Sequence, residues 1–380
     1  MTASNRSLVT PTTNPQLEKA LRAKLQGRHE SGGSLGELEP LAIRLGLMQN
    51  SLRPHFHAPQ LLVFAADHGL VVEDIRDPHG RSTQDTVRLL LTNQLPLSLF
   101  ARAQGVDLTI VDCGMSENLV PHDRLLVRKI AYGTRNSRVT SAMSMEQAHA
   151  GMRAGMQIGE QLRGNLTILS AVGVGAHESA AMVLSRLTDS KVRDLIVSGP
   201  QMSQEQLSHL MLVLQGAQAR HRDVVEPVEV LAAMGGYEVA VMVGVMLVAA
   251  SKRHLLMIDG VPACAALMLA AKIAQAVTDY CVFCRSHSHR GLDQALNLFR
   301  AAALLEMGME STDGTGAALA WPLVKSAAAL LGDVAEGDQG DQGDHGDQGD
   351  HGTASQQGGL SDPYLGTAPE ASPFGTPALY

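Results

Sequence analysis

The stretch QLLVFAADHG (residues 60–69) has the composition of a buried β-strand that ends in polar residues and glycine. A nearly continuous apolar run is typical of a strand covered on both faces, whereas a strand with one wet face alternates apolar and polar residues. We therefore predict a buried strand of a parallel sheet here, with Asp67, His68 and Gly69 at its carboxyl end.

Five further runs have the same composition, and segments of helical periodicity such as residues 145–162 and 204–217 lie between the runs. This alternation predicts an α/β fold, a parallel six-stranded sheet with helices on both faces. The five runs are DLTIVDCG (107–114), NLTILSAVG (165–173), RDLIVSG (193–199), RHLLMIDG (253–260) and TDYCVF (278–283).

Ligands of such sheets bind at the carboxyl ends of the strands. Besides Asp67, the side chains and glycines expected there are Asp112, Gly173, Gly199 and Asp259. The binding site is therefore expected among these residues.

The first 50 residues have helical patterns without a strand. Residues 14–27 are amphipathic, and Ser34 and Glu37 have the spacing of a capping box before a second apolar helix at 38–50. We expect two helices here.

The C-terminal part of the body also lacks strand-like runs, and residues 295–308 and 316–332 are expected to be helical. We predict one small helical domain built from both ends of the chain. The predicted boundaries are 1–50 and 293–332 for this helical domain, 51–292 for the α/β domain and 333–380 for a disordered tail.

The charge of the chain is concentrated in that tail. Nine acidic residues and no Lys or Arg lie between Asp333 and Tyr380, so subtracting them from the net charge of −8 leaves +1 for the body. The repeated Gly and Asp residues cannot build a core, which predicts disorder. A nearly neutral body with 3% aromatic residues argues against nucleic-acid binding.

Membrane and secreted classes are also disfavoured. The apolar stretches 230–250 and 261–277 contain Glu238 and Lys272, which suits buried helices better than membrane spans. The N-terminus has no apolar signal segment, and four cysteines in 380 residues are no disulfide framework. We expect a cytoplasmic protein.

Three stretches, in this order, resemble the nicotinate-nucleotide–dimethylbenzimidazole phosphoribosyltransferase family of cobalamin lower-ligand synthesis. They are LLVFAADHG (61–69), EVLAAMGGYEVAVMVGVMLVAA (229–250) with MIDG (257–260), and DGTGAALAWPLV (313–324). Weaker similarity covers roughly residues 15 to 330. The resemblance implies a parallel α/β domain with a small helical domain, and a homodimer.

The resemblance also implies a reaction, the transfer of phosphoribose from nicotinate mononucleotide to a benzimidazole nitrogen. Nicotinate leaves as a neutral pyridine without protonation, whereas the attacking azole must lose a proton, so one carboxylate base is the main requirement. The phosphate needs backbone N–H groups at glycine-rich strand ends or helix N-termini. No metal and no cofactor are expected, and small molecules are the expected partners.

The family's base is a glutamate in a Gly-Glu-Gly-Thr/Ser-Gly turn, and Asp313 stands in that place here. Aspartate is competent as a base, but it is one methylene shorter, and small misplacements cost rate. The alternative is that Asp313 only caps the helix that begins near Gly316.

Other family positions are changed. A second family glutamate is replaced by Ala171, and the Asn-Thr-Thr that follows in the family is replaced by Ala176-His177-Glu178. The family's phosphate-binding lysine has no counterpart, since no lysine lies between Lys191 and Lys252. His177 or Glu178 is considered as a replacement for the lost carboxylate, and an ordinary helix start is the alternative.

The family's Ser-His-x-Ser-Ala-Glu segment is CRSHSH (284–289) here, in which Arg285 is a candidate for the lost positive charge. Several glycine motifs survive, and glycines let the backbone approach a ligand. Close packing of helices on the sheet explains such glycines equally well. The predicted binding residues are Asp67, His68, Gly173, Gly235, Gly236, Asp259, Gly260, Arg285, Gly314, Thr315 and Gly316.

Cys281 and Cys284, followed by His287 and His289, resemble a metal-ligand cluster. A single Cys-x-x-Cys without a second pair is weak evidence, so we predict no metal site. Two hypotheses remain. The chain is an active base phosphoribosyltransferase, or it is a catalytically degenerate homologue that serves as a partner subunit or binds nucleotide or benzimidazole.

Overall fold

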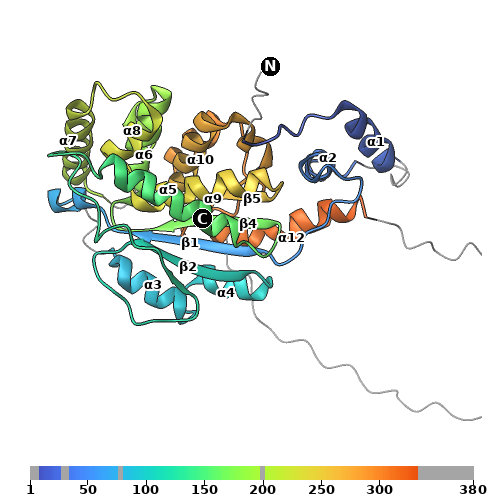
Figure 1. The fold of residues 1–380 in the computed structure, drawn as a ribbon, viewed down its shortest axis with the longest axis horizontal. Coiled ribbons are helices and arrows are strands. Elements are labelled where there is room, and N and C mark those ends of the chain that lie inside the picture. The colour runs from blue at the N-terminus through green and yellow to red at the C-terminus, as the bar shows by residue number, and fades with distance from the viewer. Residues whose placement is uncertain (1–7, 27–33, 76–79, 197–201, 333–380) are drawn as a thin grey trace, which may run out of the picture. The chain divides into compact units, whose positions relative to one another are not determined.

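The computed structural model describes residues 8–26, 34–75, 80–196 and 202–332 (Figure 1). Within these residues the strands form one parallel six-stranded sheet in the order β3-β2-β1-β4-β5-β6. The predicted fold class is therefore confirmed. The strands are β1 Gln60–Ala66, β2 Asp107–Gly114, β3 Leu125–Val127, β4 Leu166–Val172, β5 Leu255–Asp259 and β6 Cys281–Cys284.

Helices cover both faces of the sheet. Figure 1 shows α5, α9 and α10 on one side of the strands and α3 and α4 on the other. The helices in order are α1 Pro15–Gln26, α2 Leu38–Gln49, α3 Thr83–Leu91, α4 Pro96–Ala103, α5 Met145–Glu160, α6 Ala176–Thr188, α7 Gln204–Arg220, α8 Pro227–Met234, α9 Tyr237–Ser251, α10 Val261–Ile273, α11 Arg290–Leu298 and α12 Thr315–Ala329. Short 3-10 turns are η1 Gly69–Glu73, η2 Val192–Asp194 and η3 Gln275–Tyr280.

The close contact of α5 with α9 explains the glycines of α5. A β-carbon at Gly155 would overlap the carbonyl oxygen of Val241, so only glycine lets the two backbones approach this closely. Helix α9 is buried over most of its length, including Glu238. No helix in the described ranges has the length and apolarity that a membrane span requires.

One predicted strand is wrong. Arg193 and Asp194, at the start of the run 193–199, belong to the turn η2, whose backbone bonds are local, and residues 197–199 lie outside the described part. The charges of Lys191, Arg193 and Asp194 suit an exposed turn better than a strand buried on both faces. The sixth strand is instead the three-residue edge strand β3.

Two helix predictions at the chain ends also need correction. Ser34 forms no capping box with Glu37; the backbone N–H of Leu35 donates to Glu39 at 2.9 Å instead. The helix expected at 295–308 ends at Leu298, and Arg300, two residues later, takes a left-handed conformation at φ 52°.

Helix α2 packs against both α1 and α12, and α12 also packs on α4, β5 and β6. The helices from the two ends of the chain therefore lie together. The division into separate domains stays a prediction, as does disorder of residues 333–380, which lie outside the described part.

Candidate active site

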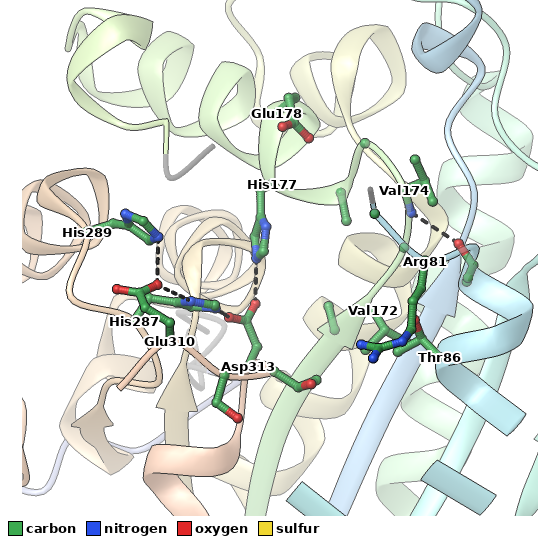
Figure 2. A pocket seen from close by; sticks show the side chains of 18 of the residues that line it. Arg81, Thr86, Val172, Val174, His177, Glu178, His287, His289, Glu310 and Asp313 are labelled. Carbon is green, nitrogen blue, oxygen red and sulfur yellow. Dashed lines mark hydrogen bonds and ion pairs between the residues drawn. The ribbon is translucent and has the colours of Figure 1, made fainter. Parts of the chain in front are cut away.

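From β1 the chain continues outward to β2 and β3, whereas from β4 it continues outward to β5 and β6, so the sheet has a switch point between β1 and β4. A cavity of about 590 Å³ opens at the carboxyl ends of these two strands. Such a switch point is where open α/β sheets bind ligands. Residues that follow β1 and β4 line one part of the cavity, and the segment before α12 lines another (Figure 2). The lining includes Gly173, His177, Glu178, His287, His289, Glu310 and Asp313 from the region considered in the sequence.

Glycine at position 175 lets α6 begin at the cavity. Gly175 has φ 88°, a left-handed conformation that side chains rarely adopt, and it is the N-cap of α6. The turn from β4 into α6 therefore places Ala176 and His177 on the cavity wall.

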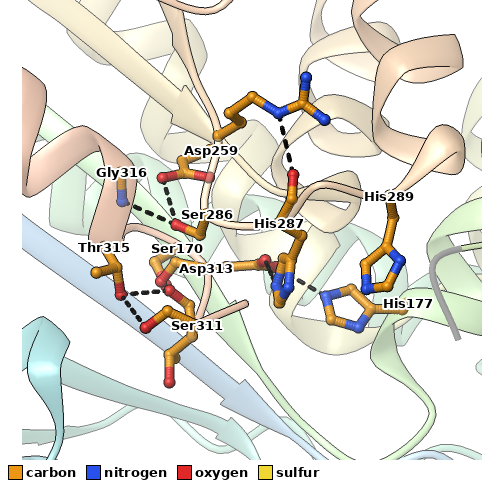
Figure 3. A network of polar contacts seen from close by, with 12 residues as sticks. Ser170, His177, Asp259, Ser286, His287, His289, Ser311, Asp313, Thr315 and Gly316 are labelled. Carbon is orange, nitrogen blue, oxygen red and sulfur yellow. Dashed lines mark hydrogen bonds and ion pairs between the residues drawn. The ribbon is translucent and has the colours of Figure 1, made fainter. Parts of the chain in front are cut away.

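Asp313 lies at the centre of a histidine cluster (Figure 3). His177 Nε2 is 2.9 Å from one of its carboxylate oxygens, and His287 Nε2 is 3.0 Å from the other. The Asp313 side chain is 1% exposed, whereas those of His177 and His287 are 32% and 17% exposed. The carboxylate is thus held between two imidazoles that reach the cavity.

The histidines set the ionisation of this carboxylate. Burial alone would raise the pKa of Asp313, but the adjacent His177 and His287 outweigh it and hold that pKa well below its usual range. Burial opposes the charged form of His287, yet its hydrogen bond to Asp313 raises its pKa to about 9. The same balance raises the pKa of His177.

Asp313 does not cap α12, contrary to the alternative considered for it. The N-cap is Gly314, and no side chain caps it. Asp259 takes that role, since its carboxylate accepts the backbone N–H of Ala317 at 2.9 Å and the Ser286 hydroxyl at 2.7 Å. Burial and the neighbouring Asp313 raise the pKa of Asp259 to about 6.

The remaining predicted residues of the strand ends lie beside the main cavity rather than on it. The Asp67 carboxylate accepts the Thr83 hydroxyl and the backbone N–H of Ser116, and it lines a smaller hollow together with His68. His68 forms a fully buried pair with Glu238 at 3.2 Å. Burial lowers the pKa of His68, but Glu238 outweighs this and raises it overall.

Two of the predicted glycines, Gly236 and Gly260, lie next to the carboxylates of Glu238 and Asp313. A β-carbon at Gly236 would overlap Glu238 and His68, and one at Gly260 would overlap the Asp313 carboxylate. Gly235 packs against Leu231, and Gly316 against the backbone of Arg285. The Thr315 hydroxyl donates to the Thr312 carbonyl at 2.6 Å. In the described part of the chain, close packing accounts for all of these glycines.

Arg285 lies outside the residues that line the cavity. Its guanidinium is engaged with Asp293 at 2.8 Å and Glu306 at 3.0 Å. The arginine that does line the cavity is Arg81, which has no ion-pair partner among the described residues and lies apart from the histidines in Figure 2. Nothing in its local sequence marked Arg81 as a site residue.

The cysteines do not join the histidines. All four are buried and free, and Cys281 donates to the Val277 carbonyl within its own segment. The clusters of possible metal ligands among the described residues contain no cysteine. His287 was thus recognisable in the sequence as a possible ligand, but its contact with Asp313 and its proximity to His177 were not.

Comparisons with known proteins agree along almost the whole body. Residues 10–341 match a family model described as "Phosphoribosyltransferase". A protein of Cupriavidus taiwanensis named nicotinate-nucleotide–dimethylbenzimidazole phosphoribosyltransferase is 38% identical over 86% of this chain and 95% of its own. A Janthinobacterium protein of the same name is 34% identical over 88% of this chain and 97% of its own.

The fold agrees with solved structures as well. The crystal structure of the enzyme of this name from Thermus thermophilus superposes with a TM-score of 0.77. It is 27% identical and covers 84% of this chain and 96% of its own.

Proposed function

The chain belongs to the nicotinate-nucleotide–dimethylbenzimidazole phosphoribosyltransferase family, and from this premise we propose its reaction. It transfers phosphoribose from nicotinate mononucleotide to 5,6-dimethylbenzimidazole or a related lower base of cobalamin. The products are an α-ribazole-type phosphate and nicotinate. The observation that carries the proposal beyond family membership is the buried Asp313 carboxylate, which lies between two histidines on the wall of the switch-point cavity.

Asp313 acts as the general base in this proposal. The bond between the anomeric carbon and the pyridinium nitrogen breaks, and its electron pair stays on nicotinate. An azole nitrogen forms the new bond from the opposite side, which inverts the anomeric carbon, and the azole N–H proton moves to Asp313. His177 and His287 support this role by fixing both oxygens of the carboxylate in position. The low pKa that they impose on Asp313 weakens it as a proton acceptor, so its position contributes more than its basicity.

We propose that the phosphate of the nucleotide binds beside Arg81. This arginine lines the cavity, whereas the guanidinium of Arg285 is occupied by two carboxylates. A charge-assisted hydrogen bond to phosphate is about twice as strong as a neutral one. The N-terminus of α6 points at the same cavity and adds backbone dipoles that favour an anion.

The test is direct. Purified protein is incubated with nicotinate mononucleotide and dimethylbenzimidazole, and released nicotinate is measured. Turnover supports the proposal, whereas binding of both substrates without nicotinate release supports the degenerate homologue. We also propose a cytoplasmic homodimer, and analytical ultracentrifugation of the pure protein tests the dimer.

A further inference from the structure

Three side chains that are far apart in sequence bring their donor atoms to one point of the cavity wall. They are His177 at the start of α6, His287 after β6 and Asp313 before α12 (Figures 2 and 3). Their imidazole nitrogens and carboxylate oxygen all lie within 4.8 Å of one another. We propose that this trio binds a divalent transition-metal ion of the zinc class.

The spacing of the donor atoms fits such an ion. Zinc binds imidazole nitrogen and carboxylate oxygen at about 2.0–2.2 Å, which places neighbouring ligand atoms of a tetrahedral site about 3.3–3.6 Å apart. The separations of 2.9 and 3.0 Å between Asp313 and the two histidines need only small adjustments. Two imidazoles and one carboxylate favour zinc or a similar ion over magnesium or calcium, which prefer oxygen ligands.

A second carboxylate, that of Glu310, contacts the other ring nitrogen of His287. His287 presents Nε2 to Asp313, while its Nδ1 lies 3.4 Å from the Glu310 carboxylate. Glu310 is itself held by the backbone N–H of Ser288 at 3.1 Å. Metal-binding histidines commonly donate their other N–H to a carboxylate in this way, which fixes the ring and strengthens the ligand.

The backbone of Asp313 is fixed as well. The Ser170 hydroxyl of β4 donates to the Asp313 carbonyl, and Gly314 follows at φ 90°. The backbone of Asp313 is therefore anchored to β4 directly before α12 begins. Three protein ligands leave one coordination position of zinc free, and the trio borders the cavity from which a small molecule or water reaches it.

His287, His289 and Glu310 form a second possible trio. Glu310 is 54% exposed there, whereas Asp313 in the first trio is 1% exposed. A buried and fixed carboxylate loses less freedom on binding a metal, so the first trio is the site and Glu310 is its support.

The inference does not depend on phosphoribosyl transfer, since metal binding is measured without substrate. Full-length protein is titrated with Zn²⁺ by calorimetry and with Co²⁺ by visible absorption. Binding of one ion is expected, and His177→Ala and His287→Ala each abolish it. Glu310→Gln is expected to weaken it by about 10–100-fold, as loss of a supporting carboxylate usually does.

Two controls separate this site from other histidines. His149→Ala changes an exposed histidine of α5, and a double change of His345 and His351 to Gln removes the tail histidines. Both proteins are expected to bind one ion with parental affinity. Loss of binding in the tail variant, or parental binding in His177→Ala, overturns the proposal.

An experiment on the unaltered protein avoids any folding defect of the variants. Crystals of the unaltered protein soaked in Zn²⁺ are measured at the zinc absorption edge. An anomalous peak between His177, His287 and Asp313 is expected. A peak on Glu310 and His289 instead, or no peak at millimolar Zn²⁺, refutes it.

Discussion

Replacing Asp313 with asparagine removes a proton acceptor and changes almost no volume. If Asp313 takes the azole proton, kcat is expected to fall by about 10²–10⁴-fold, the usual contribution of a positioned general base. Binding of nicotinate mononucleotide is expected to stay nearly unchanged, because the nucleotide carries no proton for this group. Nicotinate release at saturating substrates, measured in the presence of a chelator, gives the rate without a metal effect.

The structural cost of the same change is modest. Asparagine loses charge-assisted hydrogen bonds to two histidines, each worth about 1.5–3 kcal/mol. His177 and His287 reach the cavity and can release their protons, so we expect a total loss of stability of about 1.5–3 kcal/mol. A domain of this size then melts within about 10 °C of the parent, and the variant is folded at assay temperature.

Two further variants complete the experiment. Asp313→Glu restores the reach of the family's glutamate and is expected to preserve or raise activity. Glu306→Gln is the matched control, since it changes a carboxylate that is 63% exposed and pairs with Arg285 outside the cavity lining. An active parent whose rate is indifferent to Asp313→Asn would show that the base lies elsewhere.

Three further predictions concern the phosphate, a buried histidine and helix packing. Arg81→Gln is expected to raise KM for nicotinate mononucleotide by about 10–100-fold, which corresponds to the loss of one charge-assisted hydrogen bond. Arg285→Gln is expected to change only the melting temperature. Steady-state kinetics checks both. Burial and nearby Lys252 lower the pKa of His254 to about 4. An unfolded histidine titrates near pH 6.5. Keeping His254 neutral therefore contributes up to about 3 kcal/mol to the free energy of unfolding, in full above pH 6.5, and this contribution is lost as pH falls towards 4. Urea unfolding across this range, with His254→Gln as comparison, measures it. Gly155→Ala is expected to cost about 1–3 kcal/mol by overpacking, whereas Gly216→Ala in α7 gains about 0.5–1 kcal/mol, as denaturant unfolding of both would show.

Each of these has a contradicting result. A raised KM in Arg285→Gln would move the phosphate to that arginine. A pH dependence that is the same with and without His254 would assign the acid sensitivity to other groups. A Gly155→Ala protein as stable as the parent would mean that α5 and α9 separate without cost.

The sheet could be predicted from sequence because burial on both faces shapes composition directly. The strands within the runs 60–69 and 253–260 have few polar residues because no side of either strand faces water. The edge strand β3 escaped prediction because its apolar run has only three residues and lies between charged residues. The opposite error arose at 193–199, where Leu and Ile next to charged residues suggested a strand although the described residues form a turn.

The site was only partly predictable. The resemblance located Asp313, and its burial beside the cavity agrees with a functional role. Its contacts were not predictable, because His177 is separated from it by 136 positions and meets it only through the order of β4, β5 and β6. Arg285 was chosen for its charge alone, and its nearby partners Asp293 and Glu306 could not be recognised without the fold.

The departures from the family's motifs bear on what the cavity does. The resemblance to the family's motifs puts Asp313 in the place of a glutamate, His177 in the place of Asn-Thr-Thr, and His287 in the altered Ser-His-x-Ser-Ala-Glu segment. Independent losses in a decaying enzyme have no reason to meet in space. These three come together within hydrogen-bond distance around one carboxylate. A shorter acid flanked by two histidines is therefore better understood as one rebuilt unit, in which the histidines hold the base while they are protonated and offer neutral nitrogen ligands to a metal ion once they release their protons.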